Sequence, residues 1–447
     1  MSELSALVQG VNLVWVLLVT FLIFFMKAGF AMLEAGQVRA KNVANQLTQT
    51  LITLCVGLLV YFLLGAGVAN LVGQATGPDP VSLSAAFSYL WGGSVDWVNW
   101  LFGGMFAIAA ANIVSGGVAG RCKPRMYVIY TVAIVGVIYP AAVGLVWNSG
   151  FLATLGFHDF AGGMVIHGMG GISGLVAAWV LGSRIDRFDD EGGVNVIPGH
   201  SVTLAVLGTL ILAFGWYGFN VGTAVKVLTV DGGSVALADF GYVGLVAINT
   251  TLGMVTGGLA AGLVTWYRTG KVDTLYLANG MLAGLVGVTG VADAIVWPGA
   301  LLLGTVAGVQ LPLVFQFVER RLRIDDVCAV FPVHGTAGIL GIVAFPLVST
   351  ATWTGGGSLT SALSQVGIQL AGVAIIGLWT AVTTFALFEV ATATGQARVT
   401  RDTEEDGLDL SQHGVETYPE FGDQGVNDSA VRTDGGNFRA ESARSDD

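Results

Sequence analysis

The sequence predicts an all-α polytopic membrane protein. Of its 447 residues, 54% are hydrophobic and only 11% are charged, and the mean hydropathy is +0.73. A water-soluble protein of this length needs far more charge on its surface. The 65 glycines suit helices that pack closely within a membrane, and they lack the strict period of a fibrous protein.

Apolar segments recur along the chain, and most have about the 20 residues that a helix needs to cross the hydrocarbon core. We predict eleven transmembrane helices from them, within a domain that covers residues 1–395. Longer segments imply tilt or overhang into the cytoplasm. The segments are 11–34, 44–72, 97–119, 125–146, 160–182, 201–224, 239–267, 275–292, 297–319, 330–349 and 366–394.

Basic residues between these segments predict the orientation. Only Lys226 lies in a connector that follows an even-numbered segment. Because basic loops stay in the cytoplasm, we expect the N-terminus outside and the C-terminus inside. The connectors after odd-numbered segments hold Arg39, Lys41, Arg121, Lys123, Arg125, Arg184, Arg187, Arg268, Lys271, Arg320, Arg321 and Arg323.

Two histidines begin the same motif, H-G-x-x-G-x-x-G, in the fifth and tenth segments. His167 and His334 therefore mark equivalent places in two repeats, 11–182 and 201–349, with 366–394 as an extra helix. Five segments is an odd number, so the repeats run in opposite directions across the membrane. Such an inverted repeat places its axis in the membrane plane, and both histidines near mid-depth.

Three roles are open for this pair: satisfied core histidines, a metal pair, or a polar constriction in an apolar pore. Two imidazoles alone make a poor zinc site, and no cysteine or carboxylate accompanies them at ligand spacing, so we predict no metal. A neutral imidazole donates from one nitrogen and accepts at the other, and burial disfavours the charged form. The pattern therefore suits passage of a small neutral molecule, or a proton relay.

The C-terminal segment 396–447 differs in composition from the rest. From Asp402 to Asp447 it holds 13 acidic residues and three arginines, which accounts for −10 of the net charge of −11. We predict an acidic cytoplasmic tail that is disordered beyond about residue 420. Cys55, Cys122 and Cys328 fall in the membrane or near the cytoplasmic face, so we expect no disulfide.

Several motifs together resemble one family. D-F-A-G-G-M-V-I-H at 159–167, G-W-Y-G-F-N-V-G-T at 215–223 and V-H-G at 333–335 resemble the signatures of the ammonium transporter (Amt/Mep/Rh) family, in its Amt-type branch. G-F-A-M-L-E-A-G at 29–36 is similar to the family's first cytoplasmic turn, and G-L-D-L-S-Q-H-G at 407–414 to its C-terminal motif.

The resemblance covers about residues 11–420 and implies eleven spans, a homotrimer in the cell membrane and one conduction path per subunit. It implies ammonium or methylammonium as substrate, no cofactor, no nucleic acid, and a PII-type signal-transduction protein as partner at the cytoplasmic face. The tail motif at 407–418 would dock either under the neighbouring subunit or on its own.

The resemblance also implies roles for single residues. Phe106, Trp147 and Thr223 would form an external site that recruits the cation, and aromatic faces attract a small cation by about 0.5–2 kcal/mol. Phe106 and Phe219 would stack as a gate, with His167 and His334 lining the pore below. Asp159 would support cation entry; because it begins the fifth segment, the role of helix N-cap is equally open.

These roles describe a transporter that recruits NH4+ outside, deprotonates it and conducts NH3. Separate transfer of the proton through the histidine pair is a further hypothesis. Two alternatives remain: an ammonium sensor with little flux, and a passive channel for neutral gas. An enzyme is not expected, because the sequence holds no nucleotide loop or nucleophile elbow.

Overall fold

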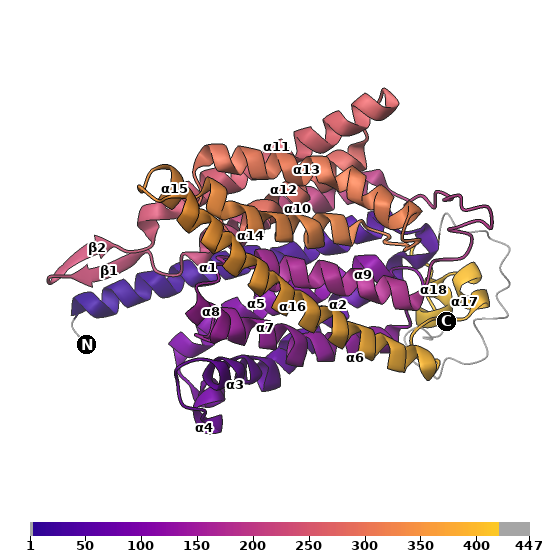
Figure 1. The fold of residues 1–447 in the computed structure, drawn as a ribbon. Coiled ribbons are helices and arrows are strands. Elements are labelled where there is room, and N and C mark those ends of the chain that lie inside the picture. The colour runs from indigo at the N-terminus through magenta and orange to yellow at the C-terminus, as the bar shows by residue number, and fades with distance from the viewer. Residues whose placement is uncertain (1–2, 420–447) are drawn as a thin grey trace, which may run out of the picture.

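The computed structural model describes residues 3–419. Long helices lie side by side in one bundle (Figure 1), and in the described part ten are long and apolar enough to cross a membrane. A shorter apolar helix, Thr274–Thr289, occupies the position of the eighth segment. The prediction of an all-helical, multi-pass membrane protein is confirmed.

The first half of the chain folds into helices that are interrupted by tighter or wider turns. In order they are α1 (Glu3–Gln37), η1 (Ala40–Asn42), α2 (Val43–Val60), η2 (Tyr61–Gly65), α3 (Ala66–Thr76), α4 (Leu83–Ala86), η3 (Ser88–Trp91), α5 (Ser94–Val118), α6 (Pro124–Ala133), η4 (Ile134–Ile138), α7 (Tyr139–Val146), α8 (Phe151–Leu155), η5 (Gly163–Gly168) and α9 (Met169–Leu181).

The second half continues with a similar set and ends in two short helices of the tail. These elements are α10 (Val202–Asn220), η6 (Val221–Thr223), β1 (Leu228–Asp231), β2 (Ser234–Leu237), α11 (Phe240–Thr269), α12 (Thr274–Thr289), α13 (Trp297–Arg320), η7 (Phe331–Thr336), α14 (Ala337–Val348), α15 (Thr350–Trp353), α16 (Leu359–Ala393), α17 (Arg401–Asp406) and α18 (Leu408–His413). The tail beyond residue 420, which we predict to be disordered, lies outside the described residues.

Each expected apolar segment forms a helix, but some ends differ. The first helix begins at Glu3 and the last long one at Leu359, several residues earlier than the hydropathy suggests, because helical hydrogen bonding continues beyond the apolar stretch. The two ends of the bundle also differ: the start of α1 lies beside β1 and β2 at one end, and α17 and α18 lie at the other (Figure 1).

A β-hairpin that the hydropathy pattern does not predict lies between α10 and α11. Its strands pair antiparallel, Leu228 opposite Leu237 and Asp231 opposite Ser234, around Gly232 and Gly233, whose φ angles are +56° and +82°. Two consecutive positive φ angles are typical of a tight hairpin turn. Asn12 of α1 anchors the hairpin, since its side chain donates to the Leu228 carbonyl and accepts from that residue's N–H.

Glycines allow the central helices to touch backbone to backbone. A Cβ added at Gly171 of α9 would lie 2.1 Å from the backbone nitrogen of Gly335 in η7, and one at Gly341 would lie 1.9 Å from the Gly287 carbonyl oxygen. Lipid tails are as apolar as the helix side chains, so the hydrophobic effect does not drive helices together within a membrane. Close van der Waals packing of this kind holds them together instead.

We predict that Gly171→Ala lowers stability by about 1–3 kcal/mol, because the methyl group forces two helices apart. Gly367→Ala on α16 is the control, since its Cβ meets nothing within 4 Å. The thermal unfolding midpoint of the purified protein in detergent measures both. Equal midpoints for the two variants would contradict the close-packing argument.

Candidate functional site

His167 and His334 lie face to face inside the bundle. Their Nδ1 atoms are 3.1 Å apart, their ring centroids are 5.2 Å apart, and the rings are 12° from parallel. The exposed fraction is 2% for His167 and 7% for His334. At this distance one Nδ1 donates a hydrogen to the other. The structure thus brings together two residues that are 167 positions apart in the chain.

Neighbouring aromatic rings hold the pair in place. The His167 ring stacks on Trp216 at 5.1 Å between centroids, and the Trp216 indole N–H donates to the Thr289 hydroxyl at 2.8 Å. A ring stacked on one face and hydrogen-bonded at Nδ1 has little freedom to rotate. The remaining ring nitrogen, His167 Nε2, is buried and has no partner in the described part of the chain.

Both histidines lie in π-helical turns, and each turn is preceded by a buried aspartate eight residues before the histidine. The turns are η5 for His167 and η7 for His334. Asp326 accepts from the N–H groups of Val330 and Phe331 at 2.8 Å. A π turn widens the helix locally and is frequent at functional sites. The sequence does not predict these turns, because their hydrogen bonding depends on tertiary contacts.

Asp159, the corresponding aspartate of the first half, has the geometry of a helix cap. Its two carboxylate oxygens accept four backbone hydrogen bonds of 2.7–2.9 Å at the start of the fifth span. The residue is 4% exposed and does not line the cavity described below. Of the two roles left open by the sequence, this geometry fits the cap. The donors are Gly162, Gly163, Met164 and Val165.

Aromatic side chains continue from the histidines toward the end of the bundle that holds the N-terminus. Phe219 lies 5.6 Å from the His167 ring and stacks on Phe106 at 4.2 Å, with 25° between the ring planes. Phe106 in turn makes an edge contact with Trp147 at 6.1 Å. The two phenylalanine rings therefore lie between the histidines and the Trp147 region.

Above the phenylalanines is a cavity of about 700 Å³ whose lining includes Phe106, Trp147 and Thr223. The Thr223 hydroxyl donates to the Phe219 carbonyl at 2.9 Å, so its single hydrogen is used and its oxygen remains free to accept. The Trp147 indole N–H donates to the Asp159 carbonyl at 2.7 Å, which fixes the ring. The cavity thus offers aromatic faces and a hydroxyl acceptor to a small cation.

This cavity is also lined by other aromatic residues, for which neither the sequence nor the family resemblance implies a role. They are Tyr61, Tyr89, Trp100, Phe102, Tyr139 and Phe160. Nothing in a single sequence separates them from ordinary core or interfacial aromatics, which this chain has in number: 23 phenylalanines, 11 tryptophans and 10 tyrosines.

Comparison with known proteins decides the family. The sequence model of the Ammonium Transporter Family matches residues 14–418. The chain belongs to the ammonium transporter family. It is an ammonium transporter of the Amt type, a multi-pass membrane protein and not an enzyme.

Curated relatives cover nearly the whole chain. Ammonium transporter Amt2 of Haloferax mediterranei is 59% identical over 97% of this chain and 95% of its own length. Ammonium transporter Amt1 of Methanocaldococcus jannaschii is 38% identical over 92% and 98%. Among solved structures, a protein titled Sensor Amt Protein matches with a TM-score of 0.81 and 28% identity, covering 92% of this chain and all of that one. Candida albicans Mep2 matches with a TM-score of 0.76, 27% identity and coverage of 93% and 92%.

At the opposite end of this ammonium transporter, charged loops surround a second cavity of about 390 Å³. Arg184 donates from Nε and Nη2 to both carboxylate oxygens of Asp325, at 2.8 and 2.9 Å. Arg187 pairs with Glu319, and Arg121 donates to the Asp325 carbonyl at 2.8 Å. These contacts join the loop after α9 to the loop before η7 and to the end of α13, and they join the turn after α5 to the loop before η7.

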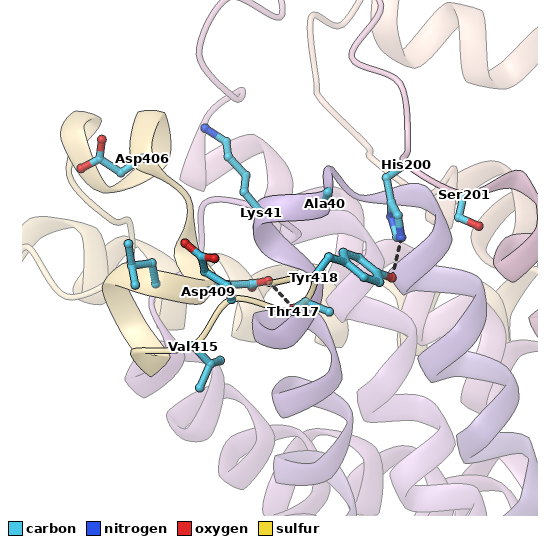
Figure 2. A pocket seen from close by; sticks show the side chains of 11 residues that line it. Ala40, Lys41, His200, Ser201, Asp406, Asp409, Val415, Thr417 and Tyr418 are labelled. Atoms are coloured by element: carbon cyan, nitrogen blue, oxygen red, sulfur yellow. Dashed lines mark hydrogen bonds between the residues drawn. The ribbon is translucent and has the colours of Figure 1, made fainter. Parts of the chain in front are cut away.

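The tail motif of this ammonium transporter docks on the start of α2 of its own chain. Asp409 of α18 accepts from the backbone N–H groups of Ala44 and Asn45 at 2.9 Å. A cavity of about 700 Å³ lies beside this contact. Figure 2 shows the side chains that line it, among them His200, whose Nε2 is 2.9 Å from the Tyr418 hydroxyl. The cavity is lined by the tail and the loops next to it, and by none of the residues around the histidine pair.

Asp325 should make the stability of the protein depend on pH. Burial alone would raise the pKa of Asp325, but the guanidinium groups of Arg121 and Arg184 outweigh it and hold the pKa well below its usual range. The stabilisation is therefore fully present above about pH 4, the pKa of an unfolded aspartate, and is lost as the pH falls further. Burial raises the pKa of Asp326 to about 6. The contribution of Asp326 to stability therefore increases as the pH falls from about 6 to 4, opposite to that of Asp325.

We expect Asp325→Asn to lower stability at pH 7 by about 3 kcal/mol, because buried arginines lose their counter-charge, and to weaken the loss of stability below pH 4. Thermal unfolding between pH 3 and 8 measures this. Glu405→Gln, which breaks the exposed ion pair with Arg401, is the control and should change stability by less than about 1 kcal/mol. An unaltered acid limb in the Asp325 variant would refute the argument.

Proposed function

We propose that each subunit recruits NH4+ at the external cavity, removes its proton near the stacked phenylalanines, and passes NH3 along His167 and His334. The observation that carries this proposal is the buried imidazole pair directly beneath the stacked rings of Phe106 and Phe219. A full charge carried through an apolar path costs many kcal/mol, whereas a neutral molecule pays only the loss of its hydrogen bonds.

The external site in this proposal consists of Phe106, Trp147 and Thr223. The aromatic faces attract any small cation, so they do not separate ammonium from potassium. The Thr223 oxygen accepts a hydrogen bond, and only ammonium has an N–H to donate. A site built around a hydrogen-bond acceptor therefore favours ammonium over an ion of the same size.

Phe106 and Phe219 would act as the gate, since their rings must separate before a molecule can reach the histidines. Below them, His167 Nε2 is buried without a partner among residues 3–419, and an unpaired polar atom in an apolar wall costs about 1–3 kcal/mol. A passing NH3 would relieve that cost. Asp159 would contribute through its fixed negative charge and through the helix start that it caps, which also positions His167.

We further propose eleven spans, as an inverted five-plus-five repeat with one extra helix, the N-terminus outside and the C-terminus in the cytoplasm. The matching units support the repeat: each half has a capping aspartate, a π turn, and a histidine eight residues after the aspartate. Residues 1–395 would form the transmembrane domain, and 396–447 the cytoplasmic tail. All the basic residues of the connectors except Lys226 lie in alternate connectors, which supports the orientation.

The assembly is proposed from the family resemblance: a homotrimer with one pore per subunit, and a PII-type signal-transduction protein bound at the cytoplasmic face. The charged loops around Arg184 and the docked tail would be the surface that such a partner meets. The described contacts of the tail, from Asp409 to the first turn of α2, support docking on its own subunit.

One alternative function has a specific observation in its favour. A solved structure titled Sensor Amt Protein has the same fold, with a TM-score of 0.81, so this fold also serves a protein named as a sensor. Uptake of radiolabelled methylammonium into proteoliposomes separates the two functions, because a sensor would show binding with little uptake. A passive gas channel would give uptake that follows ammonia and does not saturate with ammonium.

We predict that Thr223→Val raises the half-saturating methylammonium concentration about tenfold, because a hydrogen bond to a charged group contributes roughly 1.5–3 kcal/mol. Thr223→Ser keeps the hydroxyl and should remain close to the unmodified protein. Uptake and current measured over a range of concentrations test both variants. If valine and serine behave alike, the hydroxyl has no part in recognition.

A second prediction concerns the proton. If the histidine pair relays it, His167→Ala and His334→Ala should each reduce the transport current about 100-fold, the usual contribution of a positioned acid–base group, while methylammonium uptake continues. Current and radiolabel uptake are measured on the same proteoliposomes. Thr131→Val, which removes a buried hydroxyl bonded to its own helix, is the control. Full current in both histidine variants would exclude the relay.

A further inference from the structure

A buried polar cluster lies between α1, α2 and α5, apart from the histidine pore. We name it the Lys27–Glu34 cluster after its two charged members. Lys27 and Glu34 are seven residues apart on α1, so they share one helix face and are separated by about 10 Å along the axis. The cluster consists of Lys27, Glu34, Asn45, Gln46, Gln49, Asn112 and Ser115, none of them more than 8% exposed.

Side chains of α5 connect the two charges. The Lys27 ammonium donates to the Ile108 carbonyl and to the Asn112 side-chain oxygen, both at 2.8 Å. Glu34 accepts from the Ser115 hydroxyl at 2.6 Å and from the Gln46 amide at 2.5 Å. Asn112 and Ser115 are one helical turn apart, so a path of polar groups runs from the lysine to the glutamate.

Five side-chain atoms of this cluster are buried without a hydrogen-bond partner in the described part of the chain. They are Asn45 Nδ2, Gln46 Oε1, Gln49 Nε2, Gln49 Oε1 and Asn112 Nδ2. Gln49 leaves both ends of its amide unpaired, so turning the amide over repairs nothing. Each unpaired atom costs about 1–3 kcal/mol, which means that so many together require a bound partner.

The mixture of unpaired donors and acceptors identifies that partner. A metal ion would satisfy the oxygens but not the amide N–H groups, and an anion would do the reverse. Water both donates and accepts, and buried water typically bonds to polar groups that otherwise have no partner. Two ionisable residues within a membrane-spanning region also mark a functional site by default.

We propose that the Lys27–Glu34 cluster is a hydrated proton-binding site in the wall of the subunit, in which ordered water joins the Lys27 ammonium to the Glu34 carboxylate. In the exchange step an N–H bond of Lys27 breaks, the proton passes through water, and an O–H bond forms on Glu34. Lysine becomes a neutral amine and glutamate a neutral acid, so the net charge stays zero. The neutral pair avoids the cost of two separated charges in an apolar wall.

One end of the cluster lies at the proposed cytoplasmic side of the bundle. Asn45 lies at that end: its backbone N–H donates to Asp409, and its side-chain oxygen meets His413 Nε2 at 3.1 Å. Helix α18 therefore covers the end of the cluster. The other titratable groups near Glu34 are Tyr127 of α6 and Cys328 before η7. The site is independent of the pore and does not rest on the proposed transport mechanism.

Infrared spectroscopy of the full-length protein in liposomes tests the proposal. We expect a carbonyl band from protonated Glu34 that disappears in Glu34→Gln and shifts within minutes of transfer to D2O, because water reaches the group. Lys27→Met should raise the ratio of protonated to ionised Glu34 about tenfold or more, since the charged lysine favours the carboxylate. Thr209→Val on α10, a buried hydroxyl outside the cluster, should leave the band unchanged.

Two results would overturn the proposal: no Glu34-dependent band at any pH, or a band that fails to shift in D2O, which means a dry cluster. If Glu34→Gln does not fold, Ser115→Ala assigns the band instead, because loss of the hydrogen bond from Ser115 moves its frequency. Since no flux is measured, these outcomes are separate from failure of the transport proposal.

Discussion

Inside a bilayer every backbone N–H must find a partner within the protein, because no water is available to bind it. Two carboxylates meet this demand where it is most acute. Asp159 and Asp326 accept the free N–H groups at the starts of the two helices that carry the histidines. Each start lies inside the protein, so the cap fixes where the helix begins. Each cap thereby fixes the position of a histidine, His167 or His334, which lies eight residues after the capping aspartate.

Glycine contacts then determine how closely these two helix starts approach. Gly171 faces the backbone of Gly335, and Gly338 faces the carbonyl of Gly163, so each histidine-bearing helix touches the other through positions without side chains. This contact lets two imidazoles meet at hydrogen-bonding distance. Larger residues at these places would separate the rings, and the polar constriction would become two isolated buried histidines, each with an unmet polar group.

Hydropathy and charge predicted the helices, because the thickness of a bilayer sets segment length and basic residues avoid crossing it. The repeated H-G-x-x-G-x-x-G motif predicted the histidine pair. The π turns were not predicted, because a turn with one extra residue has no distinctive amino-acid composition. Tyr61 and Trp100 were not predicted either, because in a sequence the aromatic residues of a cavity cannot be distinguished from those of a core. The hairpin at Gly232 and Gly233 was not predicted, because its strands have only four residues each and are too short for a hydropathy signal. For Asp159 the sequence left two roles open, and its four backbone bonds fit the cap.

The hydrogen bond between the two Nδ1 atoms has a consequence for direction. A neutral imidazole carries one hydrogen, so the ring that donates at Nδ1 has a bare Nε2, and the ring that accepts has an Nε2 that bears hydrogen. The two halves of the chain have matching elements, but their histidines differ: one Nε2 accepts a hydrogen bond and the other donates one. To reach the mirror arrangement, the Nδ1 hydrogen must cross to the other ring, that ring must release the hydrogen on its Nε2, and the first ring must gain a hydrogen at its own Nε2. Which tautomer is occupied would decide whether a molecule meets the acceptor or the donor first.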